Sequence, residues 1–117
     1  LIGATGGRLD HLLANLWLGA EPRFSPFLSQ IKIADKGNLV SYIAPGKHCI
    51  KKVPDMDYLA FCCMTPVREL SLKNVKYELS KVDFLQPTSL ASNEFLVGDA
   101  EVHFSEGLIA VIQSRDV

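Results

Sequence analysis

The chain has 117 residues, of which 48% are apolar and 21% are charged, and its formal net charge is −1. This length favours one globular domain with room for a fragment of a second, and it suffices to bury a core. The small net charge argues against nucleic acid or an anionic membrane as a partner, and no apolar stretch approaches the roughly 20 residues that span a bilayer.

The first elements in chain order are the end of a strand, a loop and a helix. Glycine fills three of the five positions in residues 3–7 and allows backbone angles that side chains forbid. Beyond this loop, apolar residues recur three or four positions apart, which predicts an amphipathic helix over residues 8–18. The apolar positions are Leu9, Leu12, Leu13, Leu16 and Trp17.

From Gln30 onward the apolar spacing is close to two and turn residues are frequent, which predicts a series of short strands. An irregular stretch is expected over residues 80–92. We therefore predict a mainly β fold, an antiparallel β-sandwich of the jelly-roll-like type, preceded by one α-helix. The expected strands are 31–33, 39–44, 48–53, 58–64, 67–72, 75–79, 93–97, 100–105 and 108–113.

The cysteines are Cys49, Cys62 and Cys63, an odd number without a C-x-x-C spacing. This pattern indicates thiols in a reducing cytosol rather than a disulfide framework or a zinc site. We therefore expect a cytoplasmic protein.

The glycine-rich loop, residues 3–11, is the segment whose composition suggests chemistry. The free N–H groups and the dipole of a helix start attract anions, and Arg8 can grip phosphate oxygens at two points. Asp10 offers a carboxylate of the kind that Mg²⁺ prefers, and His11 can donate a hydrogen bond or brace the loop. The alternative is a plain strand-to-helix turn in which Asp10 caps the helix or pairs with Arg8. No Walker A motif is present, because no Gly-Lys-Ser/Thr follows the glycines.

The loop sequence GATGGRLDH, residues 3–11, resembles the Gly-Gly-Arg-x-Asp-His segment of bacterial thiamin pyrophosphokinases. Further matches follow in the same order: Pro-Gly-Lys-His at 45–48, an aromatic after a basic residue within 72–79, and Ser-Asn-Glu-Phe at 92–95. The chain ending, residues 102–116, also matches, so the resemblance covers essentially the whole chain.

This resemblance implies an enzyme that transfers a pyrophosphoryl group from ATP to thiamin, with Mg²⁺, giving thiamin diphosphate and AMP. It also implies a homodimer in which thiamin lies between the α/β domain of one subunit and the sandwich of the other. Residues 1–26 would then end the catalytic α/β domain, and residues 27–117 would form the thiamin-binding sandwich. The sequence does not begin with Met, and we expect the rest of the α/β domain upstream and no kinase activity from this chain alone.

The resemblance places the functional residues in two groups. On the nucleotide side, Gly6, Gly7, Arg8 and His11 are expected to bind ATP. Arg8 and Asp10 are expected to be catalytic, and Asp10 is also the expected metal ligand. The thiamin group is Tyr77, Ser92 and Asn93. An aromatic face suits the flat pyrimidine and the cationic thiazolium of thiamin, and the serine and asparagine offer neutral donors and acceptors.

Simpler interpretations of the thiamin group remain open at this point. Tyr77 is compatible with ordinary packing on a strand, and Ser92 and Asn93 with the shaping of a turn. At the level of the whole chain, one alternative is a non-catalytic β-sandwich that serves as a binding or dimerisation module. Another is a sandwich that has lost catalysis and senses a nucleotide or a vitamin.

Overall fold

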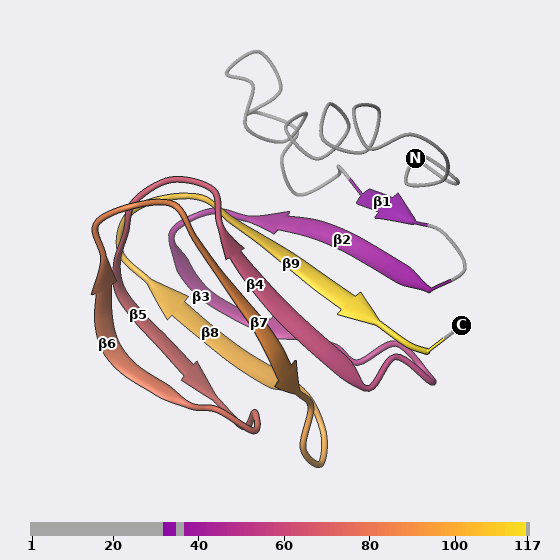
Figure 1. The fold of residues 1–117 in the computed structure, drawn as a ribbon. Coiled ribbons are helices and arrows are strands. Elements are labelled where there is room, and N and C mark those ends of the chain that lie inside the picture. Colours follow the sequence, from indigo (N-terminus) through magenta and orange to yellow (C-terminus); the bar gives the residue numbers. More distant parts are fainter. Residues whose placement is uncertain (1–31, 35–36, 117) are drawn as a thin grey trace.

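The computed structural model describes residues 32–34 and 37–116, which form nine strands in two antiparallel sheets packed face to face (Figure 1). The predicted helix over residues 8–18, the boundary after residue 26 and the glycine-rich loop lie outside the described residues. The strands are β1 (Lys32–Ala34), β2 (Asn38–Ile43), β3 (Gly46–Ile50), β4 (Tyr58–Cys63), β5 (Val67–Lys73), β6 (Leu79–Phe84), β7 (Thr88–Glu94), β8 (Ala100–Phe104) and β9 (Ile109–Ser114).

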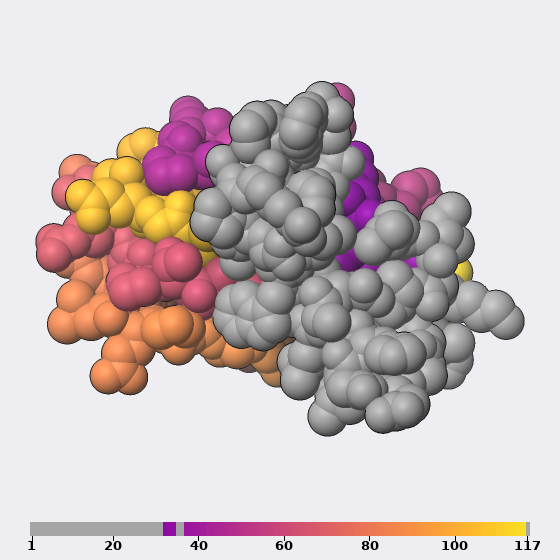
Figure 2. Space-filling view, turned by 90° about the horizontal axis from the view of Figure 1, so that it is seen from above, coloured from indigo at the N-terminus to yellow at the C-terminus, as the bar shows by residue number. Residues whose placement is uncertain are grey.

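The five-stranded sheet has the order β1-β2-β9-β4-β7, and the four-stranded sheet has the order β3-β8-β5-β6. Only β1 with β2 and β5 with β6 are neighbours both in sequence and in a sheet, so the other connections cross between the two layers. Viewed from above, yellow atoms of the last strand lie beside rose-coloured atoms of the β4 region, with orange atoms beyond (Figure 2). The predicted antiparallel sandwich is confirmed by this arrangement.

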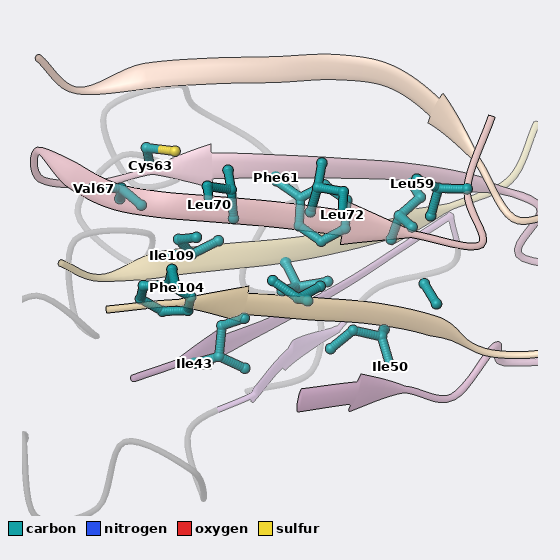
Figure 3. Packing of buried hydrophobic residues seen from close by; sticks show 14 of the residues in the cluster. Ile43, Ile50, Leu59, Phe61, Cys63, Val67, Leu70, Leu72, Phe104 and Ile109 are labelled. Atoms are coloured by element: carbon teal, nitrogen blue, oxygen red, sulfur yellow. The ribbon is translucent and has the colours of Figure 1, made fainter. Parts of the chain in front are cut away.

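The core between the sheets follows from the alternation of side chains along each strand. In β8 the apolar residues Ala100, Val102 and Phe104 are buried, while Glu101 and His103 face solvent. Figure 3 shows side chains of both sheets meeting in this core. Its fully buried members include Leu59, Phe61, Leu70, Leu72 and Phe104.

A second apolar cluster lies on the outer face of the five-stranded sheet. It contains Ile33, Val40, Tyr42, Met64 and Ala110, all buried. Strand β9 is therefore buried on both faces at its start, and this explains its unbroken apolar run over 109–112.

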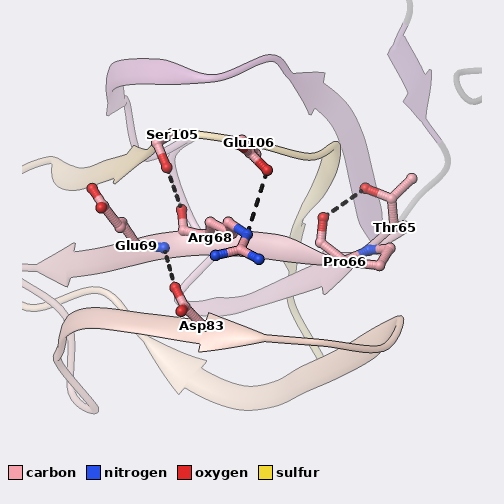
Figure 4. Close-up of polar contacts among 7 residues, drawn as sticks. All are labelled: Thr65, Pro66, Arg68, Glu69, Asp83, Ser105 and Glu106. Atoms are coloured by element: carbon pink, nitrogen blue, oxygen red, sulfur yellow. Dashed lines mark hydrogen bonds and ion pairs between the residues drawn. The ribbon is translucent and has the colours of Figure 1, made fainter.

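One end of the sandwich is closed by the turns that precede β5 and β9. Gly107 has φ +112, and a Cβ there would lie 2.5 Å from the Pro66 carbonyl oxygen, so this turn requires glycine. Nearby, Arg68 pairs with Glu106, and its carbonyl accepts a hydrogen bond from Ser105 (Figure 4).

Three of the predictions for residues 75–97 are wrong. A strand was expected over 75–79, but residues 74–78 connect β5 to β6, which begins at Leu79. Residues 80–92 contain most of β6 and β7 instead of an irregular stretch, and the strand expected over 93–97 does not form, because β7 ends at Glu94. Lys81 in β6 has φ 49 and Ser92 in β7 has φ 67, and both strands pair with register shifts. Such irregularities break the period of two on which the prediction depended.

Candidate functional site

At the end of the sandwich opposite Gly107, the connection between β5 and β6 meets the end of β7. Val75 pairs with Phe95 in an isolated bridge, and the Lys76 N–H donates to the Glu94 carbonyl at 3.0 Å. The connection leads between two strands of the four-stranded sheet, whereas β7 is the edge of the five-stranded sheet. These contacts therefore tie one layer to the other.

Asn93 continues this pairing with its side chain. Its Oδ1 accepts the Tyr77 N–H at 3.0 Å, and its Nδ2 donates to the Tyr77 carbonyl at 3.1 Å. Oδ1 also accepts the Glu94 N–H at 3.0 Å. Asn93 is 4% exposed, so these hydrogen bonds offset the cost of taking its amide out of water.

A β-bulge at Ser92 turns the Asn93 side chain toward the core. Leu59 of β4 pairs with Asn93 and Phe61 pairs with Leu90, so two steps along β4 match three steps along β7. Without the extra residue, Leu90 and Asn93 would point to opposite faces, because side chains alternate along a strand. With it, Leu90 packs against the core and Asn93 is buried on the same side.

The Tyr77 side chain projects from this clamped segment and is 56% exposed. The ammonium of Lys76 lies 5.4 Å from the centre of its ring and pairs with Glu94 at 2.9 Å. The hydrogen bond to Glu94, followed by the charge of that carboxylate, raises the pKa of Lys76 above its ordinary value. Lys76 is therefore a cation at neutral pH beside an aromatic ring that faces solvent.

A hollow of about 150 Å³ opens beside Tyr77. Strand residues of both sheets form its apolar walls, and Tyr77 and Asn93 border it. Pockets that hold a whole small molecule usually enclose roughly 300–1,000 Å³. This hollow therefore suits one ring of a ligand, or one wall of a larger site. The lining residues are Leu72, Tyr77, Leu79, Leu90, Ala91 and Asn93.

A larger hollow of about 320 Å³ lies near the other edge of the same end. Its walls include Lys32, Lys51 and Gln113. Among the described residues that line it, two are lysines, whose charge disfavours a cationic ligand, and none is aromatic. The two hollows therefore differ in the class of molecule that each can accept.

The structure brings two of the sequence-predicted residues, Tyr77 and Asn93, to one hollow, and it places Ser92 exposed at the bulge beside them. The apolar walls and the pair of Lys76 with Glu94 were not predicted. The predicted nucleotide and metal residues lie outside the described residues: Gly6, Gly7, Arg8, Asp10 and His11.

Two general features of residues 32–34 and 37–116 bear on the site. Within these ranges, no three or more His, Cys, Asp or Glu side chains gather closely enough to hold a metal ion. The same part of the chain contains no helix long and apolar enough to cross a membrane.

Comparison with known proteins gives consistent matches. Residues 47–109 match the family described as "Thiamin pyrophosphokinase, vitamin B1 binding domain". A crystal structure of a thiamin pyrophosphokinase family protein from Enterococcus faecalis is 55% identical, with a TM-score of 0.94 over 99% of this chain and 55% of that one. A protein from Lactobacillus plantarum is 48% identical, with a TM-score of 0.93 over 99% of this chain and 57% of that one.

Among curated proteins, thiamine pyrophosphokinase of Bacillus subtilis (strain 168) is 31% identical over 121 aligned residues, which cover 99% of this chain and 54% of the relative. The chain thus spans about half the length of the proteins that it matches.

Proposed function

The chain belongs to the thiamin pyrophosphokinase family through its vitamin B1 binding domain, and from this membership we propose that it supplies the thiamin-binding half of a thiamin pyrophosphokinase. The observation that carries the proposal is the hollow beside Tyr77, which combines an exposed aromatic ring, apolar walls and a neutral amide. Thiamin offers a flat pyrimidine and a cationic thiazolium, and both can stack on an aromatic face.

The proposed reaction is pyrophosphoryl transfer. The hydroxyl oxygen of thiamin attacks the β-phosphorus of ATP, the bond from that phosphorus to the α–β bridging oxygen breaks, and AMP leaves as the hydroxyl proton is lost. Such a transfer depends mainly on positioning and on neutralising charge. The sandwich contributes position, because it can hold the thiamin ring system while the hydroxyl reaches the nucleotide.

The proposal assigns ATP and Mg²⁺ to the glycine-rich loop, on its resemblance to the family segment. Gly6, Gly7, Arg8 and His11 would bind the nucleotide, Arg8 and Asp10 would be catalytic, and Asp10 would hold the metal. Mg²⁺ would neutralise phosphate charge there. Within the described ranges the residues do not provide a metal site of their own, so we assign no metal chemistry to the sandwich.

The small size of the hollow supports a site completed by other parts of the enzyme. At about 150 Å³ and open to solvent, it covers only part of a molecule with two rings. We propose that the α/β domain of a second subunit covers the remainder, in a cytoplasmic homodimer. Ser92, exposed at the bulge, would face that shared space.

The test is thiamin binding by the complete enzyme, measured by calorimetry, with Tyr77→Ala, Tyr77→Phe and a matched control. Loss of ring stacking, worth about 0.5–1.5 kcal/mol, predicts binding weaker by roughly 2–10-fold for Tyr77→Ala and little change for Tyr77→Phe. Tyr58 is also exposed, at 41%, but side chains alternate along β4 and Leu59 faces the core, so Tyr58 lies on the opposite face of the sheet from the hollow and Tyr58→Ala should not change the affinity. Unchanged binding by Tyr77→Ala would remove the hollow from the thiamin site.

A second candidate is a non-catalytic binding or dimerisation module, because the chain spans only about half the length of the relatives that it matches. The isolated chain separates the two. The shared-site proposal predicts weak or no thiamin binding by this chain and no AMP from ATP, Mg²⁺ and thiamin. Tight binding without turnover would favour the module, and robust AMP formation would contradict both.

A further inference from the structure

We infer that Asn93 is a positioning residue, which directs the Tyr77 ring by holding the Tyr77 peptide and acts on the ligand through that ring. This inference rests on the proposed function, because it concerns the same hollow. It is carried by the two hydrogen bonds that join the Asn93 amide to both polar groups of the Tyr77 main chain, at 3.0 and 3.1 Å.

The position of the Tyr77 ring depends on its main chain. With 56% of the residue exposed, few packing contacts hold the ring in place. The connection that carries it is anchored at one end by the buried Val75 and at the other by Leu79, where β6 begins. Between these anchors, Asn93 binds the Tyr77 N–H and C=O together, much as a neighbouring strand would. A stacking surface needs this fixed direction, because a mobile ring must be ordered when the ligand binds.

The hydrogen-bond capacity of the Asn93 amide argues against a mainly direct role. An amide oxygen has two lone pairs, and both are taken, one by the Tyr77 N–H and one by the Glu94 N–H. The nitrogen has two hydrogens, and one is donated to the Tyr77 carbonyl. At 4% exposed, the side chain offers a ligand at most one remaining N–H.

The bulge at Ser92 supports the same conclusion. Ser92 has φ 67, which costs a non-glycine residue about 1–2 kcal/mol. The extra residue turns Asn93 from the solvent face to the inner face, where it can reach Tyr77. Strained backbone of this kind is found where local geometry serves a site.

The decisive experiment is a double-mutant cycle in the complete enzyme, with thiamin affinity measured for Tyr77→Ala, Asn93→Ala and the double variant. If Asn93 acts through the ring, Asn93→Ala alone weakens binding, by at least about two-fold and by no more than Tyr77→Ala does. The double variant then binds within about two-fold of Tyr77→Ala, because no ring remains to be positioned. The matched control is Gln113→Ala, which removes another buried amide without touching Tyr77.

Each outcome of the cycle separates this inference from the proposed function. If Tyr77→Ala leaves the affinity unchanged, the proposed function fails. A different outcome is that Tyr77→Ala weakens binding and the double variant loses the affinity of both single variants combined. Asn93 then contacts the ligand directly, so the inference fails while the proposed function stands. If Asn93→Ala binds like the wild type, the inference fails as well.

Two further measurements cover the case in which Asn93→Ala does not fold. In Asn93→Asp the ionised carboxylate still accepts from Tyr77 but cannot donate, whereas the protonated form can do both. Burial raises the pKa of a carboxyl group at this position above its ordinary value of about 3.9. The affinity of the variant, relative to the wild type at each pH, should therefore rise as the pH falls toward that raised pKa; a ratio that stays constant down to the lowest pH at which the protein is folded overturns the inference. In the unmodified protein, NMR should detect scalar coupling across the hydrogen bond from the Tyr77 nitrogen to the Asn93 side-chain carbonyl carbon, and its absence would contradict the clamp.

Discussion

Asn93 and Gln113 are the most deeply buried polar side chains among the described residues, and each binds main-chain groups of a neighbouring segment. Both pair with Leu59, one on each side of β4, so they lie on one line across the five-stranded sheet. Gln113 accepts the Val53 N–H at 2.9 Å and donates to the Lys51 carbonyl at 3.0 Å, as Asn93 does with Tyr77. Each amide thus ties its sheet to a segment that adjoins a strand of the opposite sheet.

The two clamps differ in what the held segment presents to solvent. The segment held by Asn93 carries an exposed aromatic ring beside an apolar hollow. The segment held by Gln113 lines a hollow with two lysines instead. The same pattern, a buried amide that accepts a main-chain N–H and donates to a main-chain carbonyl, therefore occurs both at the candidate site and away from it. A functional role can be argued only from the side chains that the amide positions.

The largest expected effect comes from removing either amide. Asn93→Ala and Gln113→Ala each leave main-chain groups without partners, and each should lower the free energy of unfolding by about 1–3 kcal/mol. Urea denaturation measures this loss. If the comparison is right, the two variants are similarly destabilised but only Asn93→Ala weakens thiamin binding. Equal loss of affinity in both would mean that it follows from general destabilisation.

How far the sequence predicts these features depends on the regularity of each strand. In β8 the alternation of Ala100, Val102 and Phe104 with polar residues is regular, and it predicts the strand. In β6 and β7, Lys81 and Ser92 adopt positive φ and break the alternation, so neither strand was predicted in full. A backbone angle of this kind is set by pairing across the sheet and leaves no local signal.

The candidate site also depends on contacts between residues that are far apart in the sequence. Tyr77 and Asn93 were proposed from a family resemblance, and no local pattern shows that their hydrogen bonds join residues 16 positions apart. The walls of the hollow come from three different strands, through Leu72, Leu79 and Leu90. Apolar residues at such positions look like ordinary core residues in the sequence, because only the topology brings them together.

A smaller effect is expected from substitutions of Ser92. They test the backbone conformation of the bulge separately from the side-chain hydroxyl. Ser92→Gly relieves a positive φ but adds flexibility to the unfolded chain, so the free energy of unfolding should change by no more than about 1 kcal/mol. If its hydroxyl binds thiamin as proposed, the loss of one hydrogen bond weakens binding by roughly 2–10-fold.

Ser92→Ala is the control, because it removes the hydroxyl and keeps the strain. Both variants should lose the same affinity while differing in stability. Wild-type affinity in both would exclude Ser92 from the site and leave it a purely structural role in the bulge.

The smallest effect is expected from Lys76, whose ion pair with Glu94 lies beside the clamp but at the surface. An exposed pair contributes little, so Lys76→Met should lower the free energy of unfolding only slightly at neutral pH. Because the pKa of Lys76 in the folded state is raised, the stability that its ion pair contributes is present below the unfolded-state pKa, which is about 10.4 for lysine. That stability is lost as the pH rises through the folded-state pKa.

The difference in unfolding free energy between wild type and Lys76→Met should thus vanish at high pH. The difference for Asn93→Ala, which involves no titrating side chain, should persist. Chemical denaturation between pH 8 and 11 measures both. A Lys76→Met difference that stays constant to pH 11 would show that the side chain acts through packing on Tyr77 and not through its charge.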